Sequence, residues 1–299
     1  MYISGISDEA GKPLENQIRA HQELGWGQME MRAVSVNGHP AANLHDISEE
    51  DFLVVERTVK DAGLEVCCFS STIANWGKKI DESGESSLVE SRRAIDRMKR
   101  LGTRFIRIMS FAVRPDTNDQ MAPERFRRLR EIVGMFQGEG LIPLHENCMN
   151  YGGMGWPYTL ELLNEVEGLK LIFDTGNPFF SDDRSAPPPW KKQSTWEFYR
   201  HVRDHIAHVH IKDGVWNPAK GKADHCFPGE GEGDIPAIVT DLAERGYDGG
   251  FVIEPHLGAV FHDPTSTCPD DLQYTTYVEY GRRTQRLVSG IYANVAAKA

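Results

Sequence analysis

The stretch at residues 234–255, "DIPAIVTDLAERGYDGGFVIEP", contains one complete unit of helix, turn and strand. Its apolar residues recur with a helical period from 234 to 245, and Gly246 follows where a left-handed residue commonly closes a helix. Residues 249–255 then form a short apolar run, which is typical of a strand buried on both faces. The unit therefore predicts a helix that returns to a buried strand, with Glu254 at the C-terminal end of that strand.

The same unit recurs along the chain and predicts the architecture. Runs typical of strands occupy residues 2–6, 27–32, 64–71, 103–111, 141–147, 169–175, 206–212 and 249–255. Helical patterns lie between them, at 14–25, 48–62, 84–101, 123–138, 158–167 and 234–245, and several end at a glycine: Gly25, Gly63, Gly102, Gly140, Gly168 and Gly246. Eight strands alternating with helices predict parallel βαβ units with right-handed crossovers. Their near-regular spacing, without a GxGxxG motif after the first strand, favours an α/β fold of the (β/α)8 TIM-barrel type over a doubly wound sheet.

The chain is expected to form a single domain over residues 1–299, because one such barrel typically takes about 250 residues and no linker divides the sequence. Residues 270–297 are expected to form a terminal helix. Two connections that follow strands are long, at 176–195 and 213–233. Loops of this kind lie at the C-terminal face of a barrel, where active sites of such barrels are built.

Composition limits the kind of partner. The chain is 40% hydrophobic and 26% charged, and its formal net charge of -11 disfavours a general binder of nucleic acid or of anionic membranes. No apolar run reaches the length of about 18 residues that a membrane span needs, and the N-terminus lacks the pattern of a signal peptide. Five cysteines, an odd number without a CxxC pair, suit a reduced interior. We therefore expect a cytoplasmic protein.

Ionisable residues stand at the ends of the last four predicted strands. These residues are Glu146, Asp174, His210 and Glu254. A single acid at a strand end is more often a helix cap or a solvated residue, but four on successive strands would meet at one rim. Three carboxylates there would repel one another unless a cation neutralised them. Carboxylate oxygens with one imidazole predict one divalent metal ion, Mn²⁺ first, with Mg²⁺, Co²⁺ or Zn²⁺ as alternatives.

The histidines of "HIAHVHIKD", residues 205–213, can be sorted by strand alternation. His208 and His210 share a face, and His210 is nearer the C-terminal end. We therefore expect His210 to be the metal ligand and His208 to lie behind it or in the core. His205 precedes the strand and is expected to be structural.

Two motifs carry a resemblance to a known family. "HVHIKD" and "PGEGEGDIPAIVTDLAERGYDGGFVIE" resemble the His-x-Lys-Asp and Gly-x-Gly-x-x-Asp motifs and the final glutamate of the xylose-isomerase-like barrels. The early segment "ISDEAGKPLENQIRAHQELGWGQMEMR" resembles the first βα unit of that family, with Glu30 in its second strand. This superfamily holds sugar isomerases and epimerases, inosose dehydratases and endonuclease IV. The resemblance implies the same four metal ligands and a sugar substrate. We expect the substrate to contact Asn177, Lys212, His256 and Trp216.

The chain also departs from the family pattern. "DTGN" places Asn177 where the isomerases often have a histidine, and the chain lacks an arginine soon after "HIKD". "LHENCMNYGGMGW" and "FDTGNPFF" resemble instead the metal-bearing subunit of bacterial C-glycoside deglycosidases, which act on 3-oxo-glycosides. That narrower resemblance implies that His145, beside Glu146, is the catalytic base. Ideal alternation places these two side chains on opposite faces unless the strand bends.

The expected chemistry is removal of a proton beside a sugar carbonyl with help from the metal. His145, Glu146 and Glu254 are the expected catalytic residues, and His256 is a further candidate base. Cleavage of an oxidised glycoside is the first expectation and sugar isomerisation or epimerisation the alternative. A dehydratase resembling the inosose enzymes and a non-catalytic sugar-binding barrel remain open, as do a homo-oligomer and a second, different subunit. The aromatic residues of the long loops would either hold an aromatic aglycone or pack among themselves.

Overall fold

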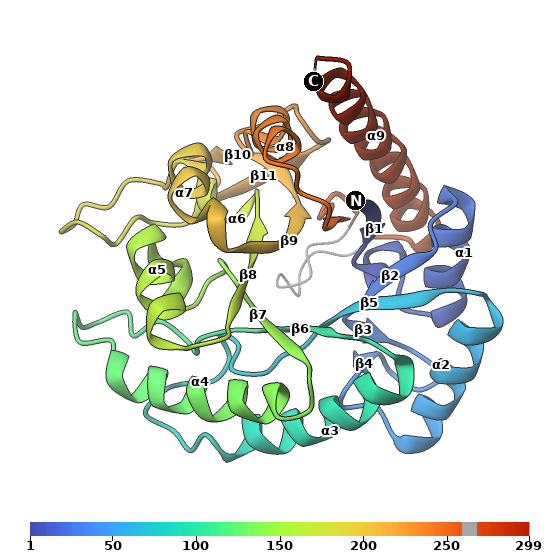
Figure 1. Cartoon of the computed structure of the whole chain (residues 1–299), viewed down its shortest axis with the longest axis horizontal. Coiled ribbons are helices and arrows are strands. Elements are labelled where there is room, and N and C mark those ends of the chain that lie inside the picture. Colours follow the sequence, from blue (N-terminus) through green and yellow to red (C-terminus); the bar gives the residue numbers. More distant parts are fainter. Residues whose placement is uncertain (259–267, 299) are drawn as a thin grey trace.

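The computed structural model describes residues 1–258 and 268–298, and it confirms the barrel. Eight strands form one sheet: β1 (Tyr2–Gly5), β2 (Gln28–Met31), β5 (Glu65–Ser70), β6 (Phe105–Ile108), β7 (Ile142–Glu146), β8 (Lys170–Asp174), β9 (Ile206–Ile211) and β12 (Gly250–Ile253). Their order is β1-β12-β9-β8-β7-β6-β5-β2, and neighbouring strands are parallel. A parallel bridge between Ile6 and Glu30 brings the two ends of the sheet together, so that the barrel is nearly closed (Figure 1). Each strand lies within a run that the sequence predicted.

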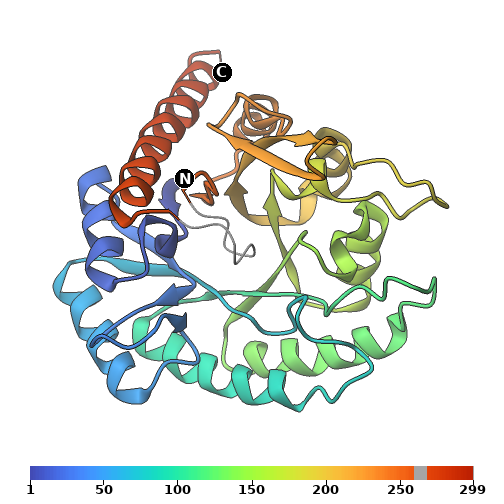
Figure 2. The ribbon, with the colours of Figure 1, turned by 180° about the vertical axis from the view of Figure 1, so that it is seen from behind.

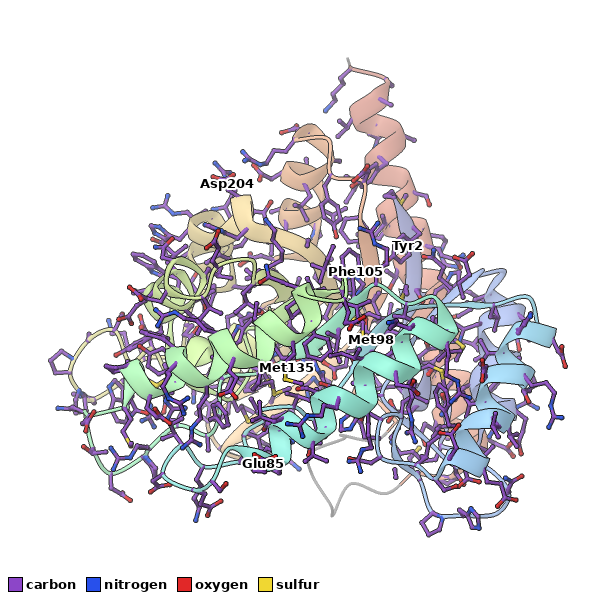
Figure 3. The ribbon with its side chains drawn as sticks, turned by 60° about the horizontal axis from the view of Figure 1, so that its bottom comes forward. Tyr2, Glu85, Met98, Phe105, Met135 and Asp204 are labelled. Carbon is purple, nitrogen blue, oxygen red and sulfur yellow. The ribbon has the colours of Figure 1, made fainter. Side chains whose placement is uncertain are left out.

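Helices cover the outside of the barrel (Figures 1 and 2). They are α1 (Leu14–Leu24), α2 (Glu49–Asp61), α3 (Glu85–Leu101), α4 (Ala122–Gln137), α5 (Trp156–Glu165), α7 (Thr195–Val202) and α8 (Ile235–Glu244). Figure 3 shows α3 and α4 side by side on the outer wall, with Met98 on α3 and Met135 on α4. The six glycines expected to follow helices all have positive φ angles, which glycine adopts at little cost. Helix α7 was not expected from the sequence, and its first turn is capped by the Ser194 hydroxyl, which accepts from the Glu197 N–H.

The terminal helix α9 (Asp270–Ala296) matches the expected range of 270–297. It runs between α8 and α1 and buries Tyr277, Tyr280 and Val288 (Figure 1). Among residues 1–258 and 268–298, no helix is long and apolar enough to cross a membrane. All five cysteines are free thiols.

The two long loops carry structure of their own. The first contains the short helix α6 (Asn177–Phe180) and an antiparallel bridge between Asp182 and Lys192. The second contains the antiparallel pair β10 (Asp213–Asn217) and β11 (Lys222–Cys226). Smaller elements are β3 (Ala33–Val34), β4 (Ala42–Asn43) and the 3-10 turns η1 (Ser7–Ala10), η2 (Tyr151–Met154) and η3 (Arg203–His205). Both long loops follow strands and therefore lie at the C-terminal face.

Apolar side chains form two separate clusters. The large cluster fills the layer between the strands and the surrounding helices. A small cluster within the barrel consists of Cys68, Leu144 and Ile172, with partly buried neighbours such as Phe105. Polar side chains at the C-terminal ends of the strands fill the rest of the interior, and this arrangement places the ionisable residues of the site in a buried environment.

Candidate metal centre

The structure brings the four expected ligands together. Glu146 ends β7, Asp174 ends β8, His210 lies in β9 and Glu254 directly follows β12. One ligand atom of each lies within 4.8 Å of those of the others, and all four side chains are buried. The strand register explains part of this geometry, because Asp174 is paired with His210 across β8 and β9.

His210 presents its two ring nitrogens to different groups. Its Nδ1 lies 3.4 Å from Glu146 Oε1, and its Nε2 lies 3.1 Å from Glu30 Oε1. Burial alone would lower the pKa of His210, but Glu30 and Glu146 outweigh it and raise that pKa to about 10. In the protonated ring Nε2–H donates to Glu30 and Nδ1–H points towards Glu146. A bound cation would take the place of the Nδ1 proton, with Nε2–H kept on the carboxylate behind it.

Glu30 connects both histidines of the strand. Its Oε2 lies 2.7 Å from His208 Nε2, and the Ser70 hydroxyl donates to its Oε1. His208 is buried and lies behind His210, as expected. The His-x-His spacing thus places two imidazoles on one buried carboxylate, and only one of them reaches the metal cluster.

Protein cations already pair with the carboxylates of the cluster. Lys212 Nζ lies 2.6 Å from Glu254 Oε2 and 3.0 Å from Asp174 Oδ2, and Arg107 Nη1 donates to Glu146 Oε2 at 2.9 Å. Burial would raise the pKa of Glu146, but the Arg107 guanidinium and the His210 imidazole lower it to about 2. The expectation that a divalent metal ion neutralises these acids is therefore incomplete, because protein cations do so in part. A basic residue inside the apolar run "TRFIRIMSF" was the sequence signal for Arg107, and it was missed.

A second arginine, Arg32, forms ion pairs with acidic residues at the site. Its guanidinium contacts three carboxylates, at 2.7 Å from Glu254 Oε1, 2.9 Å from Glu9 Oε1 and 3.0 Å from Asp8 Oδ1. His256 Nδ1 lies 2.8 Å from Glu9 Oε1. The backbone of His256 has a φ of 51°, which is uncommon for a residue other than glycine. Arg32 therefore divides one positive charge among three carboxylates.

The donors fit a divalent cation. Asp174 Oδ2 is buried and accepts no hydrogen bond of good geometry from any residue that the structure describes, although the Lys212 ammonium lies 3.0 Å away. Burial, with the charges of Glu254 and Glu146, raises the pKa of Asp174 to about 6 despite the opposing effect of Lys212. An unsatisfied acceptor beside two carboxylates and an imidazole is a position that an oxygen-preferring cation would satisfy.

Three of the four expected substrate contacts line the cavity at this centre: Asn177, Lys212 and His256. Asn177 Nδ2 donates to Glu146 Oε1 at 3.3 Å. The cavity offers about 10 Å³, which is room for one ion or one water molecule. Trp216 lies elsewhere, in a separate cavity of about 730 Å³ beside β10, where Lys192 Nζ lies 3.9 Å from its ring centroid.

His145 points away from the metal cluster. Its Nε2 lies 3.0 Å from both Ser110 Oγ and Asn150 Oδ1, and a Cβ added to Gly152 would meet its ring at 2.3 Å. Burial lowers the pKa of His145 to about 4. The strand keeps its alternation at this point, so His145 and Glu146 face opposite sides of β7.

The His-x-Lys-Asp motif and the glycine-rich loop at 229–233 form one structural unit. The Asp213 carboxylate accepts backbone hydrogen bonds from four glycines: Gly214 at 2.9 Å, Gly229 at 2.8 Å, Gly231 at 3.1 Å and Gly233 at 2.9 Å. A Cβ on Gly231 would lie 2.4 Å from the Gly214 carbonyl oxygen. The aspartate of His-x-Lys-Asp therefore holds the glycine loop against the strand end that carries Lys212.

The chain belongs to the family of xylose isomerase-like TIM barrels, whose model matches residues 18–275. No curated protein matches the sequence. Among solved structures, the chain is similar to a D-tagatose 3-epimerase-like protein, with 16% identity over 99% of this chain and 100% of the other and a TM-score of 0.69. A xylose isomerase-like TIM barrel protein from Mycobacterium smegmatis, in complex with magnesium, shares 17% identity over 98% of this chain and 97% of the other, with a TM-score of 0.67.

A third similar structure is a 3-keto-D-glucoside 4-epimerase from E. coli, with 15% identity over 95% of this chain and 99% of the other and a TM-score of 0.61. At these identities the similarity establishes the fold of this chain and leaves its reaction to be argued from the site.

Proposed function

We propose that the protein is a divalent-metal-dependent carbohydrate enzyme of the isomerase or epimerase kind, which removes and returns a proton beside a sugar carbonyl. The observation that carries this proposal is the placement of two carboxylates, Glu146 and Glu254, in one buried four-ligand cluster. They come from β7 and the end of β12, which β8 and β9 separate in the sheet, so they approach the cavity from two directions.

The four ligands Glu146, Asp174, His210 and Glu254 would hold the cation. When bound, a divalent ion of this kind, Mn²⁺ first and Mg²⁺, Co²⁺ or Zn²⁺ as alternatives, stabilises negative charge on a carbonyl oxygen.

The protein itself supplies the groups that move the proton. Arg107 keeps Glu146 ionised, and Lys212 and Arg32 hold the pKa of Glu254 well below its usual range against the effect of burial. One carboxylate would accept the proton from the carbon next to the carbonyl. The other would first take a proton from water or a substrate hydroxyl and then deliver it to carbon from its own side, and the proton held by the first carboxylate would pass to solvent after turnover. Return to the same carbon from the opposite face gives an epimer, and return to the neighbouring carbon gives an isomer.

A second candidate is cleavage of an oxidised glycoside. A 3-oxo sugar has an acidic hydrogen on C2, and its removal allows the bond from C1 to the aglycone to break with the aglycone taking the electron pair and then a proton. Asn177 supports this candidate, because it stands in the place of the histidine found in many isomerases and donates to Glu146 at 3.3 Å. The similar E. coli structure is named for a 3-keto-D-glucoside, which supports an oxidised sugar as the substrate class.

The test is to incubate the Mn²⁺-loaded protein with free ketoses and with 3-oxo-glycosides, before and after chelation. Interconversion of ketoses, or of 3-oxo-glycosides at one carbon, supports the first candidate, and release of free aglycone supports the second. We expect Glu146→Gln and Glu254→Gln each to lower turnover by about 10²-fold or more. Asp241→Asn is a matched control, since its carboxylate binds Tyr199 and Arg203 in the outer helix layer. Full activity after complete removal of metal would refute both candidates.

A further inference from the structure

We propose that Asn147 is a positioning residue of the metal centre, whose side-chain amide fixes the main chain of Asp174 to the end of β7 and so sets the distance between two of the four ligands. This inference rests on the proposed function, because it assigns a role at the metal site that the function requires. Asn147 directly follows the ligand Glu146, and its side chain is buried, with 2% exposure.

The pairing of β7 with β8 stops before it reaches Asp174 (Figure 1). The last pair between these two strands is Glu146 with Ile172. After Glu146 the chain turns, and the Cys148 N–H donates to the Glu146 carbonyl at 2.8 Å. Asp174 lies two positions beyond the last pair, so its connection to the end of β7 has to come from a side chain.

The Asn147 amide provides this connection. Its Oδ1 accepts from the Asp174 N–H at 2.7 Å, and its Nδ2 donates to the Asp174 carbonyl at 3.0 Å. Because a main-chain N–H only donates and a carbonyl only accepts, these partners determine the orientation of the amide. Two hydrogen bonds to one residue fix its distance and its rotation together, which a single bond does not.

The side chain of Asp174 is held from the opposite direction. Its Oδ1 accepts from the Gly176 N–H at 2.7 Å and from the Asn177 N–H at 2.8 Å, at the start of α6. These two bonds leave Oδ2 for a cation, and Oδ2 is the atom that lies 3.0 Å from the Lys212 ammonium. With its main chain held by Asn147 and its Oδ1 held at α6, Asp174 presents one oxygen in one direction.

A second asparagine joins the same two strand ends. Asn177 follows β8, and its Nδ2 donates to Glu146 Oε1 at 3.3 Å. Asn147 thus reaches from β7 to the main chain of Asp174, while Asn177 reaches back to the side chain of Glu146. A shift of the Asn147 amide would therefore move Asp174 Oδ2 relative to Glu146. Groups that orient metal ligands in this way typically contribute about 10- to 100-fold to metal affinity.

The test is the metal affinity of Asn147→Leu, which keeps the approximate size of the side chain and removes both hydrogen bonds. The full-length protein would be titrated with Mn²⁺ in competition with a chromophoric chelator, with circular dichroism to confirm the fold. We expect binding to weaken by about 10- to 100-fold. If leucine prevents folding, Asn147→Ala removes the same amide without its bulk and gives the same comparison.

Gln193→Met is the matched control. Gln193 is 7% exposed, and its amide donates to the main-chain carbonyls of Gly153 and Asp182 instead of to a ligand. This variant loses a buried amide with two main-chain hydrogen bonds, as Asn147→Leu does, and should keep the wild-type affinity.

The visible absorption of bound Co²⁺ separates positioning from a merely structural role, because it reports how the ligands are arranged. We expect an altered Co²⁺ spectrum in Asn147→Leu and the wild-type spectrum in Gln193→Met. Weaker binding with an unchanged spectrum would overturn the inference, since the ligands would then have kept their arrangement.

Failure of the inference is distinguishable from failure of the proposed function. Wild-type affinity in a folded Asn147→Leu protein would overturn the inference and leave the function standing. A wild-type protein that binds metal through Asn147 in the expected way but converts no sugar would refute the function alone. A wild-type protein that binds neither Mn²⁺ nor Co²⁺ would refute both.

Discussion

Replacing Glu30 by glutamine tests how the barrel interior prepares the metal centre. Glu30 accepts from His210 Nε2 at 3.1 Å and from His208 Nε2 at 2.7 Å. Glutamine has a single acceptor oxygen, so its NH₂ group must face one of these two imidazoles. If it faces His210, the Nε2–H loses its acceptor, and the metal-binding form of the ring, with its proton on Nε2 and Nδ1 free, becomes less favourable. If it faces His208, the bond to His210 survives but loses its charge-assisted character.

Either outcome weakens metal binding. Loss of a carboxylate behind a ligating histidine typically costs about 10- to 100-fold in metal affinity, or about 1.4 to 2.7 kcal/mol. The assay is a competition titration of Mn²⁺ and Zn²⁺ against a chromophoric chelator, with circular dichroism to confirm the fold. Asp241→Asn again serves as the control and should keep the wild-type affinity. An unchanged dissociation constant in a folded Glu30→Gln protein would refute the reasoning.

Two further predictions concern buried histidines outside the metal cluster, His145 on β7 and His21 on α1. His145→Ala should lower turnover less than about tenfold with metal retained, because the ring contacts Ser110 and Asn150 outside the cavity; a loss of about 10²-fold would restore it as the catalytic base. Burial lowers the pKa of His21 to about 4, against about 6.5 in the unfolded chain. Stability that is complete above pH 6.5 should therefore fall as pH drops towards 4, by about 1.4 kcal/mol per pH unit from this group. Urea unfolding at pH 7 and pH 5 should show a smaller loss in His21→Asn, and equal losses in both proteins would contradict the assignment.

The sequence by itself predicted the barrel and the four candidate ligands that the structure brings together. Each buried strand is a short apolar run, and its period and length are local properties that the chain shows directly. The positions of Glu146, Asp174 and Glu254 at strand ends were equally local. Because parallel strands present their C-terminal ends at one rim, local position was sufficient to predict that these acids meet.

Strand alternation was as informative as the strand pattern. It predicted that His210 would face the cluster and that His208 would lie behind it. It also placed His145 on the face of β7 opposite to that of Glu146. The deglycosidase resemblance, which implies that His145 is the base, would have required a bend in the strand at this point. The observed strand does not bend there, because Ser110, Asn150 and Gly152 enclose the imidazole on the far side of β7.

Only the tertiary structure decided which cations and which aromatic residues belong to the site. Arg32 and Glu254 are separated by 222 positions in the chain, and no spacing rule links them. Trp216 follows the His-x-Lys-Asp motif by a few residues, yet the β10–β11 hairpin carries it into a different cavity, whereas Trp76 from a distant loop lines the metal centre. Strand ends are placed by hydrogen-bonded register, which the local sequence encodes. Loop and ion-pair partners are placed by packing between distant segments, which becomes defined only when the barrel closes.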